Sequence, residues 1–281
     1  MTPPARASPL IRAALIGVTG RMGQALLRAA PGFPQLIITG AIASAGSLAL
    51  GRDAGEVAGL GVAANLPVTA DLVASLARAD VAIDFSHAAA TGATLAACRA
   101  ARKPLLLGTT GFGAELEAQF EAAAGDIALL VAANTSIGVA VLLELTRRAA
   151  QTLPRNFDID ILDMHHRTKQ DAPSGTALAL ARAAAEARGA SLEEGAALAP
   201  IAALRSPRAE GEIRFAAVRA GDIVGAHTVL FSGIGEELSV THRAGDRSIF
   251  ARGALAAALW LASRPPGRYG MADFISDKTA S

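Results

Sequence analysis

Apolar and polar residues alternate along the first half of the chain in a pattern that favours strands and helices in turn. Short apolar runs, typical of buried strands, occupy residues 13–18, 36–43, 81–85, 105–107 and 127–133. Stretches of helical composition follow at 24–30, 71–79, 91–102, 115–124 and 137–150. The glycine-rich stretch 46–64 predicts a loop. This alternation predicts an α/β fold with a Rossmann-like, doubly wound parallel sheet.

From residue 157 the pattern changes to strands with few helices. Strand-like runs lie at 157–164, 213–218, 227–231 and 237–242, with one long helical stretch at 177–188. They predict a smaller α+β domain, with a hairpin turn at 219–227. A helical stretch at 248–262 suggests a return to the first domain, and the tail shows little periodicity after residue 275. We therefore expect two domains, residues 1–134 with 245–281, and residues 135–244.

The composition excludes several classes of protein. With 281 residues, 52% hydrophobic and 18% charged, the chain is globular and long enough for two domains. The net charge of +1 argues against a nucleic-acid partner. The single cysteine, Cys98, excludes an intrachain disulfide and is expected to be a packed thiol inside a helix. No uncharged apolar run approaches the ~20 residues of a membrane span, so we expect a cytoplasmic protein with no membrane partner.

A glycine-rich turn follows the first predicted strand. The residues G-V-T-G-R-M-G, from Gly17 to Gly23, stand between that strand and a helix. Glycines permit a tight turn in which backbone amides approach a diphosphate. The spacing differs from G-x-G-x-x-G, so an ordinary turn is the alternative. The position between strand and helix favours nucleotide binding, with Arg21 able to pair with a phosphate.

Small polar residues also follow two later strands. The segments are Gly108-Thr109-Thr110-Gly111 and Ala132-Ala133-Asn134-Thr135. Ligands of open parallel sheets bind at the carboxyl ends of the strands, so we expect both segments near the glycine turn, although ordinary turns are the alternative. His87 follows another strand and could lie near the cofactor or be a surface or capping residue.

The most concentrated chemistry lies in M-H-H-R-T-K-Q-D-A-P-S-G-T, residues 164–176. It combines two histidines, Arg167 and Lys169 with a serine placed to cap the next helix, whose first amides favour anions. Such a set suits a small ligand with more than one carboxylate, and histidines transfer protons near neutral pH. Surface histidines are the alternative. A metal site is not expected, because adjacent residues at a strand end point apart and no third ligand is evident.

Taken together, these motifs resemble the dihydrodipicolinate reductase (4-hydroxy-tetrahydrodipicolinate reductase) family. The resemblance is carried by G-V-T-G-R-M-G, D-F-S at Asp84, G-T-T-G-F at Gly108, A-A-N-T-S at Ala132, H-H-R-T-K-Q-D-A-P-S-G-T-A at His165 and V-R-A-G-D-I-V-G-A-H-T at Val218. They follow the family's order over nearly the whole chain. The histidine segment is the most specific of them.

The resemblance implies a reductase of the diaminopimelate route of lysine biosynthesis. NADPH or NADH would give hydride to C4 of a heterocyclic dicarboxylate, with loss of the 4-hydroxyl as water. The first domain would bind the nucleotide, and the second would bind substrate and form a homotetramer. His165 matches the proton donor and Lys169 a second acid, and the substrate ligands match His166, Ser174, Gly175 and Thr176. The cofactor contacts match Gly17, Val18, Thr19, Gly20, Arg21, Met22, Gly108, Thr109, Thr110, Ala132, Ala133, Asn134 and Thr135.

The chain departs from the family pattern in two places. Ala43 and Ser44 replace the acid and arginine often found after the second strand, so Arg21 and Ser44 could hold a 2′-phosphate, which favours NADPH or dual use. The segment before Ile213, L-R-S-P-R-A-E-G-E, lacks the usual G-H-T-G-x-R. Two rival functions are a semialdehyde dehydrogenase, which needs a reactive thiolate, and a non-catalytic NAD(P) sensor.

Overall fold

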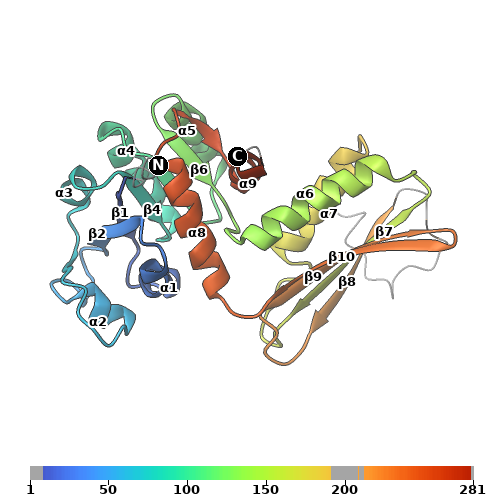
Figure 1. Ribbon diagram of the computed structural model, residues 1–281, viewed down its shortest axis with the longest axis horizontal. Coiled ribbons are helices and arrows are strands. Elements are labelled where there is room, and N and C mark those ends of the chain that lie inside the picture. The colour runs from blue at the N-terminus through green and yellow to red at the C-terminus, as the bar shows by residue number, and fades with distance from the viewer. Residues whose placement is uncertain (1–8, 191–207, 209–211, 280–281) are drawn as a thin grey trace, which may run out of the picture. The chain divides into compact units, whose positions relative to one another are not determined.

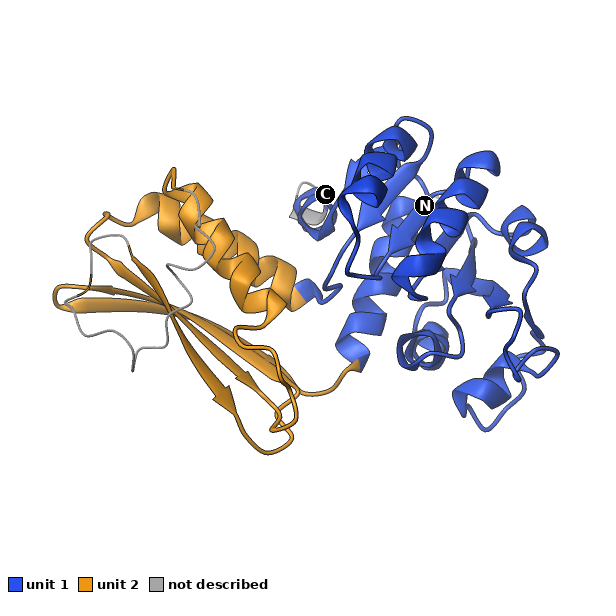
Figure 2. Ribbon diagram, turned by 180° about the vertical axis from the view of Figure 1, so that it is seen from behind, with its two compact units in different colours: residues 1–137, 248–281 blue, residues 138–247 orange. Residues whose placement is uncertain are grey.

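The computed structural model describes residues 9–190, 208 and 212–279. The chain divides into two compact units, residues 1–137 with 248–281 and residues 138–247 (Figure 2). Each junction lies three residues beyond the expected one, at 137/138 rather than 134/135 and at 247/248 rather than 244/245. None of the helices in the described part of the chain has the length and apolarity needed to span a bilayer.

Unit 1 is built on one parallel sheet. Its strands are β1 (Ile11–Ile16), β2 (Leu36–Ile42), β3 (Val68–Thr69), β4 (Val81–Asp84), β5 (Leu105–Leu107), β6 (Ala128–Val131) and β11 (Gly267–Tyr269). They run in the order β11-β6-β5-β4-β1-β2-β3, and every neighbouring pair is parallel. The chain fills the sheet outward from β1 in both directions, so the point where the order reverses lies between β1 and β4. The doubly wound sheet predicted from the alternating pattern is confirmed.

Helices cover both faces of this sheet (Figure 1). They are α1 (Arg21–Ala29), α2 (Ala54–Ala58), α3 (Leu72–Ala77), α4 (Ala88–Ala100), α5 (Ala114–Ala124), α8 (Ser248–Leu261) and α9 (Met271–Thr279). Helix α8 packs against α1 and the central strands, so the chain does return to unit 1 as expected. The central strands β4 and β5 are buried on both faces, which explains fully apolar runs such as Leu105–Leu107.

Several short elements of unit 1 were not predicted. The stretch 46–64 was expected to be a loop, yet it contains α2, which begins where the Asp53 carboxylate accepts hydrogen bonds from the amides of Gly55 and Glu56. The end of the chain, where little periodicity was found after residue 275, forms β11 and then α9, whose Phe274 is buried. Cys98 is buried inside α4, as predicted, and burial raises the pKa of its thiol to about 12.

Unit 2 is a four-stranded mixed sheet with two helices on one face (Figure 2). Its strands are β7 (Asp158–His165), β8 (Ile213–Arg219), β9 (Gly225–Gly233) and β10 (Glu236–Ala244), and its helices are α6 (Ile137–Thr152) and α7 (Gly175–Ala187). The order is β10-β9-β7-β8, with β7 and β8 parallel and the other pairs antiparallel. Apolar residues on the inner face of the sheet, such as Ile159, Ile161 and Phe231, form the core with the helices.

The prediction of a hairpin at 219–227 is wrong. Strands β8 and β9 do not pair with each other but lie on opposite sides of β7. Their connection instead crosses the end of β7, where the amide of Ala220 donates to the carbonyl of His165 and the amide of Arg167 donates to that of Gly221. The glycines indicated a turn correctly, but the pattern could not show which strands the turn joins. This crossing fixes the backbone on both sides of His165.

Candidate active site

In unit 1, the residues predicted to bind the nucleotide lie at the carboxyl ends of the strands. The glycine turn follows β1, while Gly108 follows β5 and Ala132 follows β6, so all stand at the carboxyl ends of parallel strands, with β4 between β1 and β5. Two glycines of the turn have no room for a side chain. A Cβ on Gly17, whose φ is +83°, would lie 2.8 Å from the Phe85 carbonyl oxygen, and one on Gly23 would lie 2.3 Å from the Gly17 carbonyl oxygen. The close approach of the backbone at these two positions therefore requires glycine.

The start of α1 fits an anionic ligand. Its N-cap is Gly20, which offers no side-chain cap, and no acidic residue occupies the first turn. Thr19 and Arg21 are exposed beside it, whereas the Val18 side chain is buried in the core. Uncapped amides at a helix start attract phosphate groups. The residues present thus fit the diphosphate of a nicotinamide cofactor.

The other predicted cofactor residues differ in what they offer. Thr109 is buried with a hydroxyl that has no hydrogen-bond partner among the residues that the structure describes, and Thr110 is exposed. Asn134 accepts a hydrogen bond from the amide of Ser136, and the hydroxyl of Thr135 donates to the Phe250 carbonyl at 2.7 Å. The Thr135 hydroxyl is thus engaged within unit 1.

The residues around the strand ends include one that sequence reasoning did not assign. Asp84, at the end of β4, is buried; one carboxylate oxygen accepts the amide of Ser86 at 2.7 Å, and burial raises its pKa. Ser44 is exposed just after β2, beside the buried Ala43. His87 is exposed at the N-cap of α4 and makes no capping hydrogen bond through its side chain.

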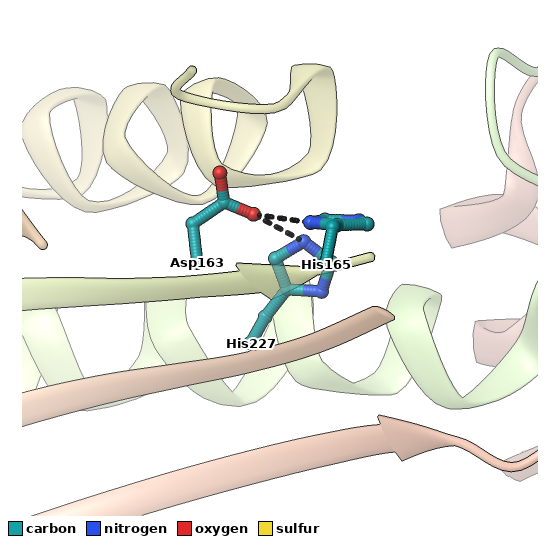
Figure 3. Close-up of side chains that lie close together, drawn as sticks. All are labelled: Asp163, His165 and His227. Atoms are coloured by element: carbon teal, nitrogen blue, oxygen red, sulfur yellow. Dashed lines mark ion pairs between the residues drawn. The ribbon is translucent and has the colours of Figure 1, made fainter. Parts of the chain in front are cut away.

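In unit 2, residues 164–176, which we call the histidine loop, are organised around a carboxylate that the sequence analysis did not assign. This carboxylate belongs to Asp163 (Figure 3). Asp163 is completely buried on the inner face of β7. Its Oδ2 accepts the amide of Ser174 at 2.8 Å and a guanidinium NH of Arg219 at 2.8 Å. Its Oδ1 lies 2.9 Å from Nδ1 of His165 and 3.4 Å from Nε2 of His227. One carboxylate thus joins the ends of three strands to the start of α7.

The surroundings keep this carboxylate ionised. Burial is the largest influence and would raise the pKa, but polar contacts with His227, Arg219 and Ser174 outweigh burial and hold the pKa of Asp163 well below its usual value. A buried charge with paired partners is the arrangement in which proteins tolerate burial.

His165 projects from the end of β7 with only 12% of its side chain exposed. A Cβ on Gly225 would lie 3.1 Å from Nε2, so the missing side chain leaves room for the ring. Burial lowers the pKa of His165 below its ordinary value. The charge of Asp163 opposes this shift, and those of His227, Lys169 and Arg219 add to it.

The remaining residues of the loop are placed as follows. Ser174 caps α7 by accepting the amide of Ala177, and its hydroxyl lies 3.1 Å from Nε2 of His227. Gly175 is exposed at the first turn of α7, and Thr176 is half-buried. Lys169 pairs with Asp171 at 2.8 Å. Nδ1 of His166 lies 2.8 Å from the hydroxyl of Thr168. His166 is therefore not part of the Asp163 cluster, which we define as Asp163 with His165, Ser174, Arg219 and His227.

The expectation that no third metal ligand accompanies the histidines overlooked this cluster. Ligand atoms of Asp163, His165 and His227 lie within 4.8 Å of one another, a grouping that could hold a metal ion. The guanidinium of Arg219, however, already neutralises the carboxylate, and the charge of Lys169 acts on the same imidazole. These cations favour an anionic ligand over a metal cation at this place.

The atypical segment before Ile213 lies largely outside the described residues. Within it, Arg208 contacts Asp158 at 3.1 Å and Asp160 at 2.8 Å on β7, so this arginine is held by acids of the strand.

Comparison with known proteins identifies the family. Models for the N-terminal and C-terminal parts of dihydrodipicolinate reductase match residues 11–135 and 138–275. The 4-hydroxy-tetrahydrodipicolinate reductase of Alkalilimnicola ehrlichii is 46% identical over 264 residues, covering 94% of this chain and 98% of the relative. That of Rhizobium rhizogenes is 44% identical, covering 94% and 96%. The chain belongs to the dihydrodipicolinate reductase family.

Solved structures share the fold of this family member. The dipicolinate-bound dihydrodipicolinate reductase from Paenisporosarcina sp. TG-14 matches with a TM-score of 0.72 at 23% identity, covering 93% of this chain and 97% of that one. An amine dehydrogenase from Mycobacterium smegmatis matches with a TM-score of 0.65 at 14% identity, covering 93% and 95%. Both likenesses support the predicted fold class.

Family membership confirms the predicted activity. The chain is an oxidoreductase of the diaminopimelate route to lysine, a 4-hydroxy-tetrahydrodipicolinate reductase that uses NADH or NADPH. The two rival functions, semialdehyde dehydrogenase and non-catalytic sensor, are not supported by these relatives.

Proposed function

We propose that this reductase holds its nicotinamide cofactor on the glycine turn of unit 1 and its substrate on the loop after β7, with His165 as proton donor. The observation that carries the proposal is the Asp163 cluster. It places a buried imidazole and the amide end of α7 on the same carboxylate. A proton donor and an anion-binding helix start are the two functions that reduction of a dicarboxylate requires.

The reaction takes up one hydride and one proton and releases one water. The bound cofactor supplies the hydride to C4 of the ring, where the 4-hydroxyl is lost as water. Negative charge that builds on the conjugated imine is neutralised by a proton from the His165 imidazolium. The His165 pKa is lowered in the free protein. Two substrate carboxylates would raise it again and charge the ring when substrate is bound.

The substrate carboxylates would be held by cationic and amide groups of the same loop. Lys169 has 22% of its side chain exposed, and Gly175 and Thr176 open the first turn of α7. His166 and Ser174 complete the proposed set, with Lys169 also serving as a second acid. The related reductase from Paenisporosarcina binds dipicolinate, and we infer that this loop takes a similar small dicarboxylate.

The cofactor assignment includes a preference for NADPH or use of both cofactors. Ser44 and Arg21 are both exposed. Positions 43 and 44, which follow β2, are alanine and serine, so neither carries a negative charge that would repel a 2′-phosphate. Oxidation of NADPH and NADH measured side by side, with substrate generated by the preceding synthase, tests this preference. A strong preference for NADH would contradict it.

His165→Gln tests the catalytic assignment. We expect kcat to fall by about a hundredfold or more, the scale of a lost general acid. NADPH binding, measured by fluorescence titration, should change little because the glycine turn belongs to unit 1. An unchanged kcat would refute the assignment of His165 as proton donor.

We also propose that the enzyme is a cytoplasmic homotetramer that assembles through the sheet of unit 2. Helices α6 and α7 lie on one face of this sheet (Figure 2). The opposite face carries apolar side chains that keep some exposure: Leu162, Met164, Ala216, Val218 and Leu230. Such a face favours a protein partner. Light scattering should give four times the 28.4 kDa chain mass.

A further inference from the structure

Asp163 occupies a position where the strand pattern calls for an apolar residue. Ile159 and Ile161 precede it on the inner face of β7, and both are fully buried. Burial of a carboxylate is costly unless every lone pair finds a donor. Oδ2 is satisfied by Ser174 and Arg219, as described above. Oδ1 has no well-aligned hydrogen bond from the described residues, and its near neighbours are two imidazole nitrogens.

The nitrogen of His165 that faces Oδ1 of Asp163 also lacks a well-aligned partner among the described residues. This nitrogen, Nδ1, is buried and lies 2.9 Å from Oδ1 of Asp163. An ionised carboxylate only accepts hydrogen bonds, so the pair is satisfied when Nδ1 carries the proton. A small rotation of the ring then aligns N–H with Oδ1. Nε2, beside Gly225, becomes the nitrogen that can gain and lose a proton.

We propose that Asp163 is a positioning residue, which holds His165 in the tautomer protonated at Nδ1 and ties that ring to the anion-binding start of α7. The inference rests on the proposed function of His165 as proton donor. Asp163 acts through His165 and does not touch the substrate. Its second oxygen fixes the amide of Ser174, so one side chain sets both the proton donor and the carboxylate-binding amides.

His227 supports this arrangement from the neighbouring strand. Asp163 and His227 are directly paired across β7 and β9, and the ring of His227 meets that of His165 edge to face at 5.1 Å. Its Nε2 is shared between Oδ1 of Asp163 and the hydroxyl of Ser174. The second imidazole therefore closes the side of the cluster opposite Arg219.

Asp163→Asn, which keeps the shape of the side chain and removes its charge, tests the inference. We expect kcat to fall at least about tenfold, with a smaller change in KM. The general acid His165 would still be present, but its ring would no longer be held in the required orientation. Asp80→Asn is the control. Asp80 also pairs with an arginine, Arg12 at 2.7 Å, but it lies just before β4 in unit 1, outside the cluster and outside the sheet face proposed for assembly. Its kcat should stay within about twofold of the wild type, as is usual away from the site.

Two readouts separate positioning from mere folding. In the double variant Asp163→Asn, His165→Gln, kcat should be no lower than in His165→Gln alone, since residues that act as a unit are not additive. The charge of Asp163 raises the His165 pKa, so Asp163→Asn should move the pH at which kcat/KM declines to lower values. The other charged groups around the ring stay in place: Arg219 from β8, His227 from β9 and Lys169 from the loop.

The outcomes distinguish this inference from the proposed function. If His165→Gln has full activity, the proposed function fails and the inference with it. If His165→Gln is impaired while Asp163→Asn keeps the wild-type kcat and pH profile, only the inference fails. If Asp163→Asn does not fold, nitrogen-15 NMR of the wild-type protein decides. With five histidines in the chain, the His165 signals can be assigned from the His165→Gln spectrum. Protonation at Nδ1 supports the inference, and protonation at Nε2 alone overturns it.

Discussion

The glycine turn of unit 1 and the histidine loop of unit 2 present opposite chemistries. The turn offers the uncapped backbone amides at the start of α1, and a Cβ on Gly17 or Gly23 would lie 2.8 Å or 2.3 Å from the nearest other backbone atom. The loop depends on side chains, and one buried carboxylate, Asp163, contacts both His165 and Arg219. We therefore expect binding at the glycine turn to be most sensitive to added side-chain atoms, and activity at the histidine loop to be most sensitive to the removal of charged groups. A ligand that is recognised chiefly by its phosphates needs amides, whereas a ring that must receive a proton needs an ionisable side chain.

Adding a methyl group to the glycine turn should have the largest effect, on both stability and nucleotide affinity. In Gly23→Ala the new Cβ would lie 2.3 Å from the Gly17 carbonyl oxygen and 2.5 Å from Cα of Val18. Backbone cannot move aside easily, so we expect a cost of about 3 kcal/mol and a loss of nucleotide affinity of roughly a hundredfold. Fluorescence titration with NADPH and thermal unfolding measure the two effects. Gly32→Ala is the control, since nothing lies within 4 Å of its Cβ, and equal affinities in the two variants would contradict this account.

Removing a charge from the histidine loop should have the next largest effect. Lys169→Ala is expected to raise KM and lower kcat together, each by about tenfold, because a charge-assisted hydrogen bond to substrate is lost. Asp171→Asn is the matched control. It removes the ion-pair partner of Lys169 and keeps the ammonium, and Asp171 is 59% exposed. Steady-state kinetics should place this control within about threefold of the wild type, since exposed pairs contribute little. Wild-type values in Lys169→Ala would remove the lysine from the site.

Modifying the thiol should have the smallest effect, because neither site includes it. Cys98 is fully buried and its pKa is raised to about 12 by burial, so the nucleophilic thiolate is scarce. Iodoacetamide should leave turnover unchanged in the folded protein and label Cys98 rapidly once the protein is denatured. Loss of activity in step with labelling of the folded enzyme would instead support a thiol-dependent reaction.

Periodicity predicted the long elements and missed the short ones. Strands β1, β2 and β4 and helices α4 and α7 appear within a few residues of their expected ranges, because burial of a whole face imposes a pattern. Strand β3 has two residues and β11 has three, too few for a period of any kind. The wrong hairpin at 219–227 has a different origin. Partner strands are chosen by packing across the sheet, which the local sequence does not contain.

The residues of the candidate site were likewise predictable only in part. The histidine loop is contiguous, so its chemistry could be seen in one segment. His227 and Arg219 reach it through pairing of β7 with β9 and β8, which only the folded sheet reveals. Asp163 did carry a signal. In β7 the inward positions are Ile159, Ile161 and then Asp163, so polarity inverts midway along the strand. An acid at an apolar position indicates a buried charge with a function.

The order of the two units along the chain has a consequence for synthesis. Unit 2 is complete at residue 247, whereas unit 1 still lacks α8 and β11, the latter an edge strand of its sheet. Gly253 of α8 packs against the carbonyl of Thr135, just before the chain enters unit 2. Domains generally form as units while the chain emerges from the ribosome. The inserted unit 2 can thus close its sheet first, and the sheet of unit 1 stays open at one edge until α8 and β11 have left the ribosome.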